Sequence, residues 1–166
     1  MIARTYVLDN LKRLNSLYRR SRTHKESLFL SKLAILELCG WIEESMDDIV
    51  RRCASRCLRD LDNRKSVEKE IRRISGFQYD THFRVMLVRV IGLMNVERLE
   101  GYLDPAVHAR FVATLDALKK SRDSEAHTHL KGVTKTLNAP SLTLSHFEDV
   151  YKGLRAYDVA LRRVIP

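Results

Sequence analysis

The segment LSKLAILELCGWIEESMDDIV, residues 30–50, decides the expected fold. Its apolar residues recur every three or four positions, the spacing that lines one face of an α-helix. The predicted inward face consists of Leu30, Leu33, Ile35, Leu38, Trp41, Ile42, Met46, Ile49 and Val50. We therefore expect one long helix from about Thr23 to Leu58. Gly40 is a candidate for a kink, because glycine costs roughly 1 kcal/mol of helix propensity relative to alanine.

The same helical period continues over nearly the whole chain, and no stretch alternates apolar and polar residues as a strand does. Further helices are expected over about 5–20, over 63–74, where Gly76 ends the helix, from Asp80 or Thr81 to Met94, and over 96–100. Another is expected from Pro105 to 122, with Asp104 as its N-cap. The last begins at Ser145 with a capping box, and residues 133–144 before it are the likeliest loop. The sequence thus predicts an all-α fold, an up-and-down helical bundle with long central helices, as a single domain over residues 1–166.

The composition of the 166 residues suits a folded, basic domain. Apolar residues make up 45%, and 30 Lys and Arg against 21 Asp and Glu give a net charge of +9. A surplus of this size attracts polyanions, of which nucleic acid is the commonest inside cells. The three cysteines, Cys39, Cys53 and Cys57, favour a reducing cytoplasm over a disulfide scaffold. No apolar run is long enough for a membrane span, and no metal-ligand spacing or glycine-rich phosphate loop predicts a metal or a cofactor.

Basic residues concentrate in residues 51–73, where nine stand against four acidic ones. Two interpretations are about equally supported. One is a solvated helix surface with the i,i+4 pairs Asp60–Arg64 and Glu68–Arg72; the other is a patch that contacts phosphates. Under the second, the candidate RNA-binding residues are Arg51, Arg52, Arg72, Arg73, Lys119 and Lys120.

The segment RDSEAH, residues 122–127, combines the side chains that phosphodiester cleavage requires. Arg122 has the planar fork that clamps a phosphate at two points. His127 can give or take a proton near neutral pH, and Asp123 can orient either side chain. On one helix an i,i+5 pair points roughly 140° apart and is separated by about 7.5 Å along the axis. The long reach of arginine, a helix end, or a second copy of the segment across the axis of a homodimer would bring both side chains to one atom, and we expect the homodimer.

This segment resembles the Arg-polar-x-x-x-His signature of HEPN domains (higher eukaryotes and prokaryotes nucleotide-binding). Asp123 and Ala126 match the residues usual at their positions, and the signature lies late in an all-helical chain of suitable size. The helix containing Trp41 and Glu43 resembles the aromatic-then-acid helix of the same family. The resemblance extends from about Leu28 to His129.

The resemblance implies a helical bundle that dimerises with its two motifs facing each other. Many members are metal-independent endoribonucleases of toxin–antitoxin, phage-defence or RNA-processing systems, so RNA and a cognate antitoxin protein are implied partners. In this reading Arg122, His127 and Asp123 are catalytic. One subset, whose antitoxin is a nucleotidyltransferase, carries Tyr two residues after the His; His129 stands there in this chain, so that regulation is not carried over.

Two other interpretations stay open at this stage. The first is an inactive HEPN-like binding module, and the second is a basic helical DNA-binding protein. The sequence lacks a clear short helix–turn–helix with a polar recognition helix, which weighs against the latter. In a purely structural interpretation, Arg122 pairs locally with Asp123 or Glu125 and His127 caps a helix end.

Overall fold

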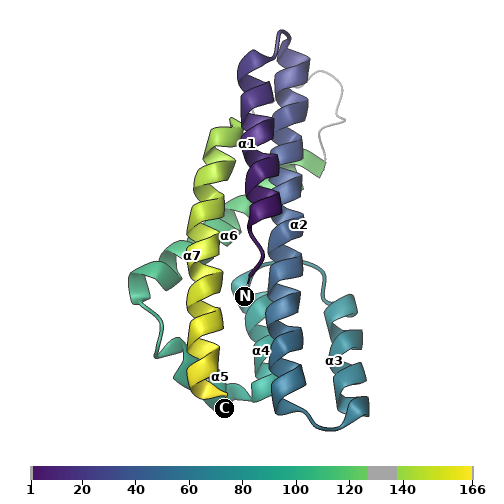
Figure 1. Cartoon of the computed structure of the whole chain (residues 1–166), viewed down its shortest axis with the longest axis vertical. Helices are drawn as coiled ribbons and strands as arrows, with labels where there is room; N and C mark the ends of the chain where they lie inside the picture. Colours follow the sequence, from purple (N-terminus) through teal and green to yellow (C-terminus); the bar gives the residue numbers. More distant parts are fainter. Residues whose placement is uncertain (1, 127–137, 166) are drawn as a thin grey trace.

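The computed structural model describes residues 2–126 and 138–165. Within them the chain forms helices joined by short loops, and it contains no strand (Figure 1), which confirms the all-α prediction. The α-helices are α1 (Thr5–Arg20), α2 (His24–Cys57), α3 (Leu61–Arg73), α4 (Arg84–Ile91), α5 (Leu93–Glu100), α6 (Pro105–Ala126) and α7 (Pro140–Val164). One π-helical turn, η1 (Tyr79–Phe83), leads directly into α4.

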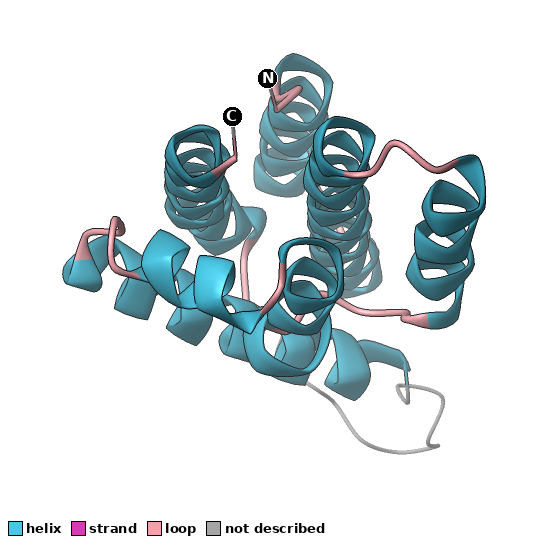
Figure 2. Cartoon of the chain, turned by 90° about the horizontal axis from the view of Figure 1, so that it is seen from below, coloured by secondary structure: helices cyan, strands magenta, loops and turns pink. Residues whose placement is uncertain are grey.

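The bundle is organised around α2, which packs against α1, α7, α6, α4 and α3. In the end-on view of Figure 2, the helices that carry the two termini, α1 and α7, stand beside α2, and α3 stands apart at one edge. The centre of α2 is fully buried at Leu38, Ile42 and Met46. The helix begins where Thr23 accepts a hydrogen bond from the backbone N–H of Glu26, the interaction expected of an N-cap residue.

The start of α6 is also as the sequence predicts. Asp104 accepts hydrogen bonds from the backbone N–H groups of Ala106 and Val107, at 2.8 and 3.0 Å. Pro105 follows as the first helical residue, where its fixed φ suits the helix and its missing N–H is not needed. This cap fixes where α6 starts, and α6 carries Arg122 near its other end.

The expected helix from Asp80 or Thr81 to Met94 is wrong in its boundaries. The chain instead forms η1 and then α4, and α4 ends at Gly92, whose φ of +79° favours glycine. Met94 belongs to α5 and is 77% exposed. A run of apolar residues predicts burial on every side, whereas the turn at Gly92 rotates Met94 out of the core.

Three details of the long helices also differ from expectation. The last helix begins at Pro140 and not at Ser145, so part of the expected loop is its first turn. Helix α2 runs through Gly40 as one continuous helix. Leu33, expected inward, is 49% exposed.

The two mid-helix glycines offer a matched test of the packing. A β-carbon on Gly153 in α7 would fall onto the ring of Phe111 in α6, whereas one on Gly40 would meet nothing within 4 Å. We expect Gly153→Ala to destabilise the protein by about 1–3 kcal/mol through overpacking. Gly40→Ala should stabilise it by up to about 1 kcal/mol through helix propensity. Urea unfolding measures both, and shifts of the same sign would contradict this packing.

Candidate active site

Arg122 reaches the core side of the bundle because it continues the inward face of α6. Leu115 and Leu118 on that face are buried against the other helices, and Arg122 follows Leu118 by four residues, or about one turn. Its Nη1 lies 2.6 Å from Oε1 of Glu43 on α2. Its guanidinium also lies over the ring of Phe77, 4.9 Å from the centroid, a favourable cation–π geometry.

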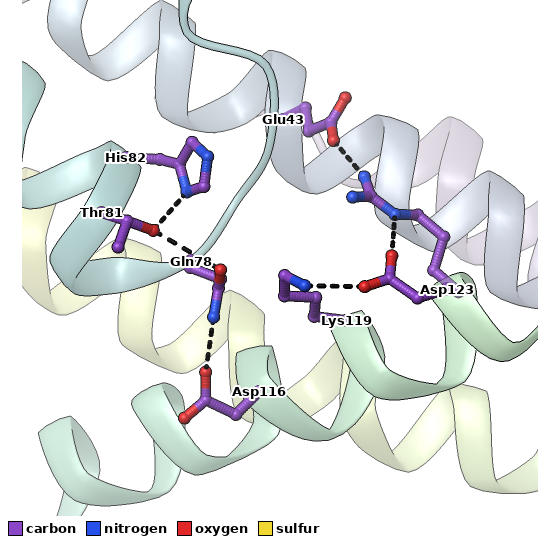
Figure 3. Close-up of polar contacts among 8 residues, drawn as sticks. Glu43, Gln78, Thr81, His82, Asp116, Lys119 and Asp123 are labelled. Carbon is purple, nitrogen blue, oxygen red and sulfur yellow. Dashed lines mark hydrogen bonds and ion pairs between the residues drawn. The ribbon is translucent and has the colours of Figure 1, made fainter.

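Asp123 and Lys119 extend this pair along α6. Lys119 Nζ donates to Asp123 Oδ2 at 2.6 Å, and Asp123 Oδ1 lies 3.6 Å from Nε of Arg122. The hydrogen bond from Lys119 holds the pKa of Asp123 below its usual value. Figure 3 shows Lys119, Asp123 and Glu43 joined by this series of contacts. Asp123 is thus placed to orient Arg122, the role suggested from the sequence, and the predicted local Arg122–Asp123 pair is present alongside the longer-range pair with Glu43.

His127 and His129 lie outside the described residues. Helix α6 is described as far as Ala126, so the predicted Arg122–His127 pair stays a prediction.

Sequence reasoning missed the partners of Arg122. Glu43 belongs to an acidic cluster with Glu44, Asp47 and Asp48, and a helical sequence alone does not indicate which carboxylate faces which neighbour. In the folded chain Glu43 faces Arg122, whereas the other three surround Arg51. The one signal that pointed to Glu43 was the resemblance of its helix to an aromatic-then-acid helix.

The segment between α3 and α4 was also missed. Phe77 is almost completely buried beneath Arg122. Gln78 donates to Asp116 of α6 at 3.4 Å, and Thr81 contacts both Gln78 and His82 (Figure 3). The sequence predicted only a helix start near Asp80 or Thr81 here and gave no link to Arg122, which lies some forty residues further along the chain.

Cys39 lies next to the ion pair but is not a candidate nucleophile. It is buried, and burial raises the pKa of its thiol to about 12, although the charge of Arg122 acts in the opposite direction. A thiol with such a pKa is not ionised at neutral pH, and the thiolate is the nucleophilic form.

The predicted RNA-binding residues fall into separate settings. Arg51 is within 4.0 Å of Glu44, Asp47, Asp48 and Glu68. Arg52 pairs with Asp158 at 3.1 Å. The remaining candidates, Arg72, Arg73 and Lys120, have exposed side chains, and the half-buried Lys119 is held by Asp123.

The i,i+4 pairs expected on the basic segment are replaced by other contacts. Glu68 pairs with Arg51 of α2 rather than with Arg72. Asp60 caps α3, and Arg64 donates to the backbone carbonyls of Leu58 and Ser55 at the end of α2. These contacts attach α3 to α2 and leave Arg72 directed to solvent.

The described residues contain no group of three or more side chains suited to a metal ion. Cys53 and Cys57 differ in setting, since Cys53 is buried and Cys57 is exposed. Within the same residues, no helix combines the length and the hydropathy needed to cross a membrane.

Comparisons with protein-family models, with curated proteins and with solved structures find no match for this chain. The function of the chain is therefore inferred from its own contacts. The most informative of them is the joint clamp on Arg122 by a carboxylate of α2 and an aromatic ring of the α3–α4 connection.

The surroundings of Asp47, in the acidic cluster around Arg51, can be tested by the pH dependence of stability. Partial burial, reinforced by Glu44, Glu43 and Asp48 and opposed by Arg51, raises the pKa of Asp47 to about 6. The folded chain therefore binds this proton more tightly than the unfolded chain, and stability falls as pH rises from about 4 to 6. We expect Asp47→Asn to stabilise the protein at neutral pH by up to about 3 kcal/mol, with the gain vanishing near pH 3.5.

Urea unfolding of both proteins at neutral and acidic pH measures this difference. Asp48→Asn is the control, because Asp48 also faces Arg51 but its side chain is 53% exposed, and we expect a change within about 0.5 kcal/mol. If Asp47→Asn raised the free energy of unfolding equally at both pH values, titration of the Asp47 carboxylate would not be the cause.

Proposed function

We propose that this chain is a metal-independent endoribonuclease of HEPN type. The observation that carries the proposal is the placement of Arg122, which occupies the predicted motif position near the end of α6 and is clamped by Glu43 and Phe77. The all-helical bundle is consistent with the fold that the resemblance implies. Catalysis is assigned to Arg122 and His127, with Asp123 orienting the arginine.

The chemistry needs few groups because RNA carries its own nucleophile. The 2′-hydroxyl attacks the adjacent phosphorus and the 5′-oxygen leaves, so a proton must be taken from one oxygen and given to the other. Positioned acid–base groups contribute roughly 10²–10⁴ to such a rate. Arg122 supplies positive charge to the phosphorane, and a charge fixed before the reaction costs no reorganisation.

The clamp leaves Arg122 able to take this role. Its side chain keeps 31% of its exposure, and the two carboxylates contact Nη1 and Nε. A guanidinium has five N–H donors in a rigid fork, so both carboxylates together do not use them all. Glu43 fixes the direction in which the remaining donors point.

The second candidate is an inactive binding module, and the same ion pair favours it. Two carboxylates within 3.6 Å offset the charge of Arg122, as they would if the arginine only joined α6 to α2. The two candidates differ in whether RNA is cut, which is a direct measurement.

RNA binding is assigned to the exposed basic surface of α3. Lys65, Lys69 and Arg72 follow one another at spacings of four and three residues and therefore share one face. Arg73 lies beside them, 3.9 Å from Glu70. Of the predicted contacts, Arg72 and Arg73 fit this role best, whereas Arg51 and Arg52 are engaged by carboxylates.

A homodimer is proposed because α2 carries an exposed apolar stripe. Phe29, Leu33 and Leu36 are 61%, 49% and 44% exposed and share one face of the helix. Glu43 continues that face two turns beyond Leu36. A two-fold interface is self-complementary, so pairing along this stripe with the two α2 helices parallel would bring the two Glu43–Arg122 sites toward each other.

The biological setting follows from the resemblance alone. We propose a cytoplasmic toxin or phage-defence effector with a cognate antitoxin protein. No cofactor is required, because the substrate supplies the nucleophile and the chain supplies the charges.

We expect the purified protein to cleave single-stranded RNA in the presence of EDTA and to leave DNA of the same sequence intact. Arg122→Ala should lower the cleavage rate by about 10²–10³. Arg122→Lys should restore it only in part, because an ammonium lacks the planar fork. His127→Ala should abolish cleavage. Single-turnover assays with labelled RNA measure each rate.

Arg110→Ala is the matched control, since Arg110 lies on the same helix with its side chain 72% exposed. RNA binding without cleavage would favour the inactive module, and binding to duplex DNA without cleavage would favour a DNA-binding protein. Full activity of His127→Ala would contradict the assignment of the motif.

For the dimer, we expect the wild-type protein to have twice the chain mass in solution and Leu33→Glu to be monomeric. The carboxylate would have to lose its hydration inside an apolar interface. Leu61→Glu is the control, because Leu61 is 68% exposed at the start of α3, away from the stripe. Size-exclusion chromatography with light scattering measures the mass, and a dimeric Leu33→Glu protein would place the interface elsewhere.

A further inference from the structure

The connection between α3 and α4 has contacts with the site that its sequence does not explain. Phe77 packs beneath Arg122, and Gln78 reaches Asp116 of α6. The connection then enters η1, where the backbone N–H groups of His82 and Phe83 both bond to the carbonyl of Gln78. Single π-helical turns occur frequently at functional sites. This turn brings His82 toward Glu43 and Arg122.

His82 is held in place by a close approach to Gly76. A β-carbon at residue 76 would lie 2.7 Å from Nε2 of His82, and Gly76 has a φ of +129°. Both facts require glycine at this position. The imidazole therefore lies directly against the backbone, which restricts the rotation of the ring.

The hydrogen bonds of the ring define which nitrogen is available. Nδ1 lies 2.8 Å from the hydroxyl of Thr81. The ring also forms a backbone hydrogen bond with Ser75 that favours its protonated form and so raises its pKa, as a ring N–H donated to a carbonyl does. In the tautomer that carries its proton on Nε2, the lone pair is on Nδ1 and accepts from the exposed Thr81 hydroxyl. The single proton of that hydroxyl is then not available to Gln78, which lies 3.5 Å away.

The charged groups that face His82 come from two helices. Glu43 of α2 favours the charged ring, whereas Arg122 and Lys119 of α6 disfavour it. Partial burial is the largest effect, and it lowers the pKa of His82 below its usual value of 6.5. His82 is therefore neutral at pH 7, the form that accepts a proton. Figure 3 shows His82 and Thr81 on one side and Glu43 on the other, with Lys119 lower in the view beside Asp123.

We propose that His82 is a second catalytic residue, the general base that takes the proton of the attacking 2′-hydroxyl. This rests on the proposed ribonuclease function. The 2′-hydroxyl of the substrate replaces the Thr81 hydroxyl at Nδ1 and loses its proton to the ring. The 2′-oxygen bonds to phosphorus, and the bond from phosphorus to the 5′-oxygen breaks. The products are a 2′,3′-cyclic phosphate and a 5′-hydroxyl, whose proton comes from His127 in its proposed catalytic role, and His82 then returns its own proton to solvent.

The test is the pH profile of single-turnover RNA cleavage for wild type, His82→Ala and His82→Gln. The wild-type rate should rise with pH through a pKa below 6.5. Both variants should be slower by about 10²–10⁴ and should lose this acidic limb. Added imidazole should restore activity to His82→Ala, because it can enter the space that the side chain vacates. A merely structural role for His82 would not produce such rescue.

His24→Ala is the matched control, since His24 is exposed at the start of α2, about 29 Å along the helix from Glu43. Circular dichroism checks that each variant is folded. An unchanged profile in folded His82→Ala or His82→Gln, while Arg122→Ala slows cleavage as expected above, would overturn the role of His82 and leave the ribonuclease function standing. Absence of RNA cleavage by the wild-type protein would overturn both.

Discussion

The requirement that α2 bury one face along its whole length arranges the rest of this protein. At 34 residues the helix is about 50 Å long, and five other helices pack against it. Its remaining faces are thereby given different surroundings. Leu33 and Leu36 are exposed on the single chain, Glu43 meets α6, and Asp47 is enclosed with other carboxylates around Arg51. One continuous helix thus supplies core, surface and site.

The contact between Glu43 and Arg122 is better understood as orientation than as stabilisation. Both side chains keep about a third of their exposure, and exposed ion pairs contribute only about 0–1 kcal/mol. The addition of Phe77 beneath the guanidinium and of Asp123 beside it fixes the arginine from three directions. A half-exposed arginine held in this way suits recognition of a phosphate. Because Glu43 faces the guanidinium, only an anion that competes with this carboxylate can bind there.

The sequence predicted the elements whose signals are local and strong. Helix α1, the extent of α2 and the Asp104 cap of α6 follow from period and capping, which depend on residues a few positions apart. The errors arose where two signals competed. The apolar run from Phe83 to Met94 predicted one helix, but Gly92 with its positive φ divides it. The capping pattern at Ser145 lies inside a helix that Pro140 had already started.

By itself the sequence determined the helical class, the basic surplus and the motif that includes Arg122, because helical period, charge and motif spacing are properties of the chain read in order. Only the tertiary structure decided what surrounds Arg122. Glu43 lies 79 residues from it, and Phe77 and His82 come from a connection with no motif of its own. These partners meet because α2, α6 and the α3–α4 connection bury their apolar faces together, and burial does not depend on distance along the chain.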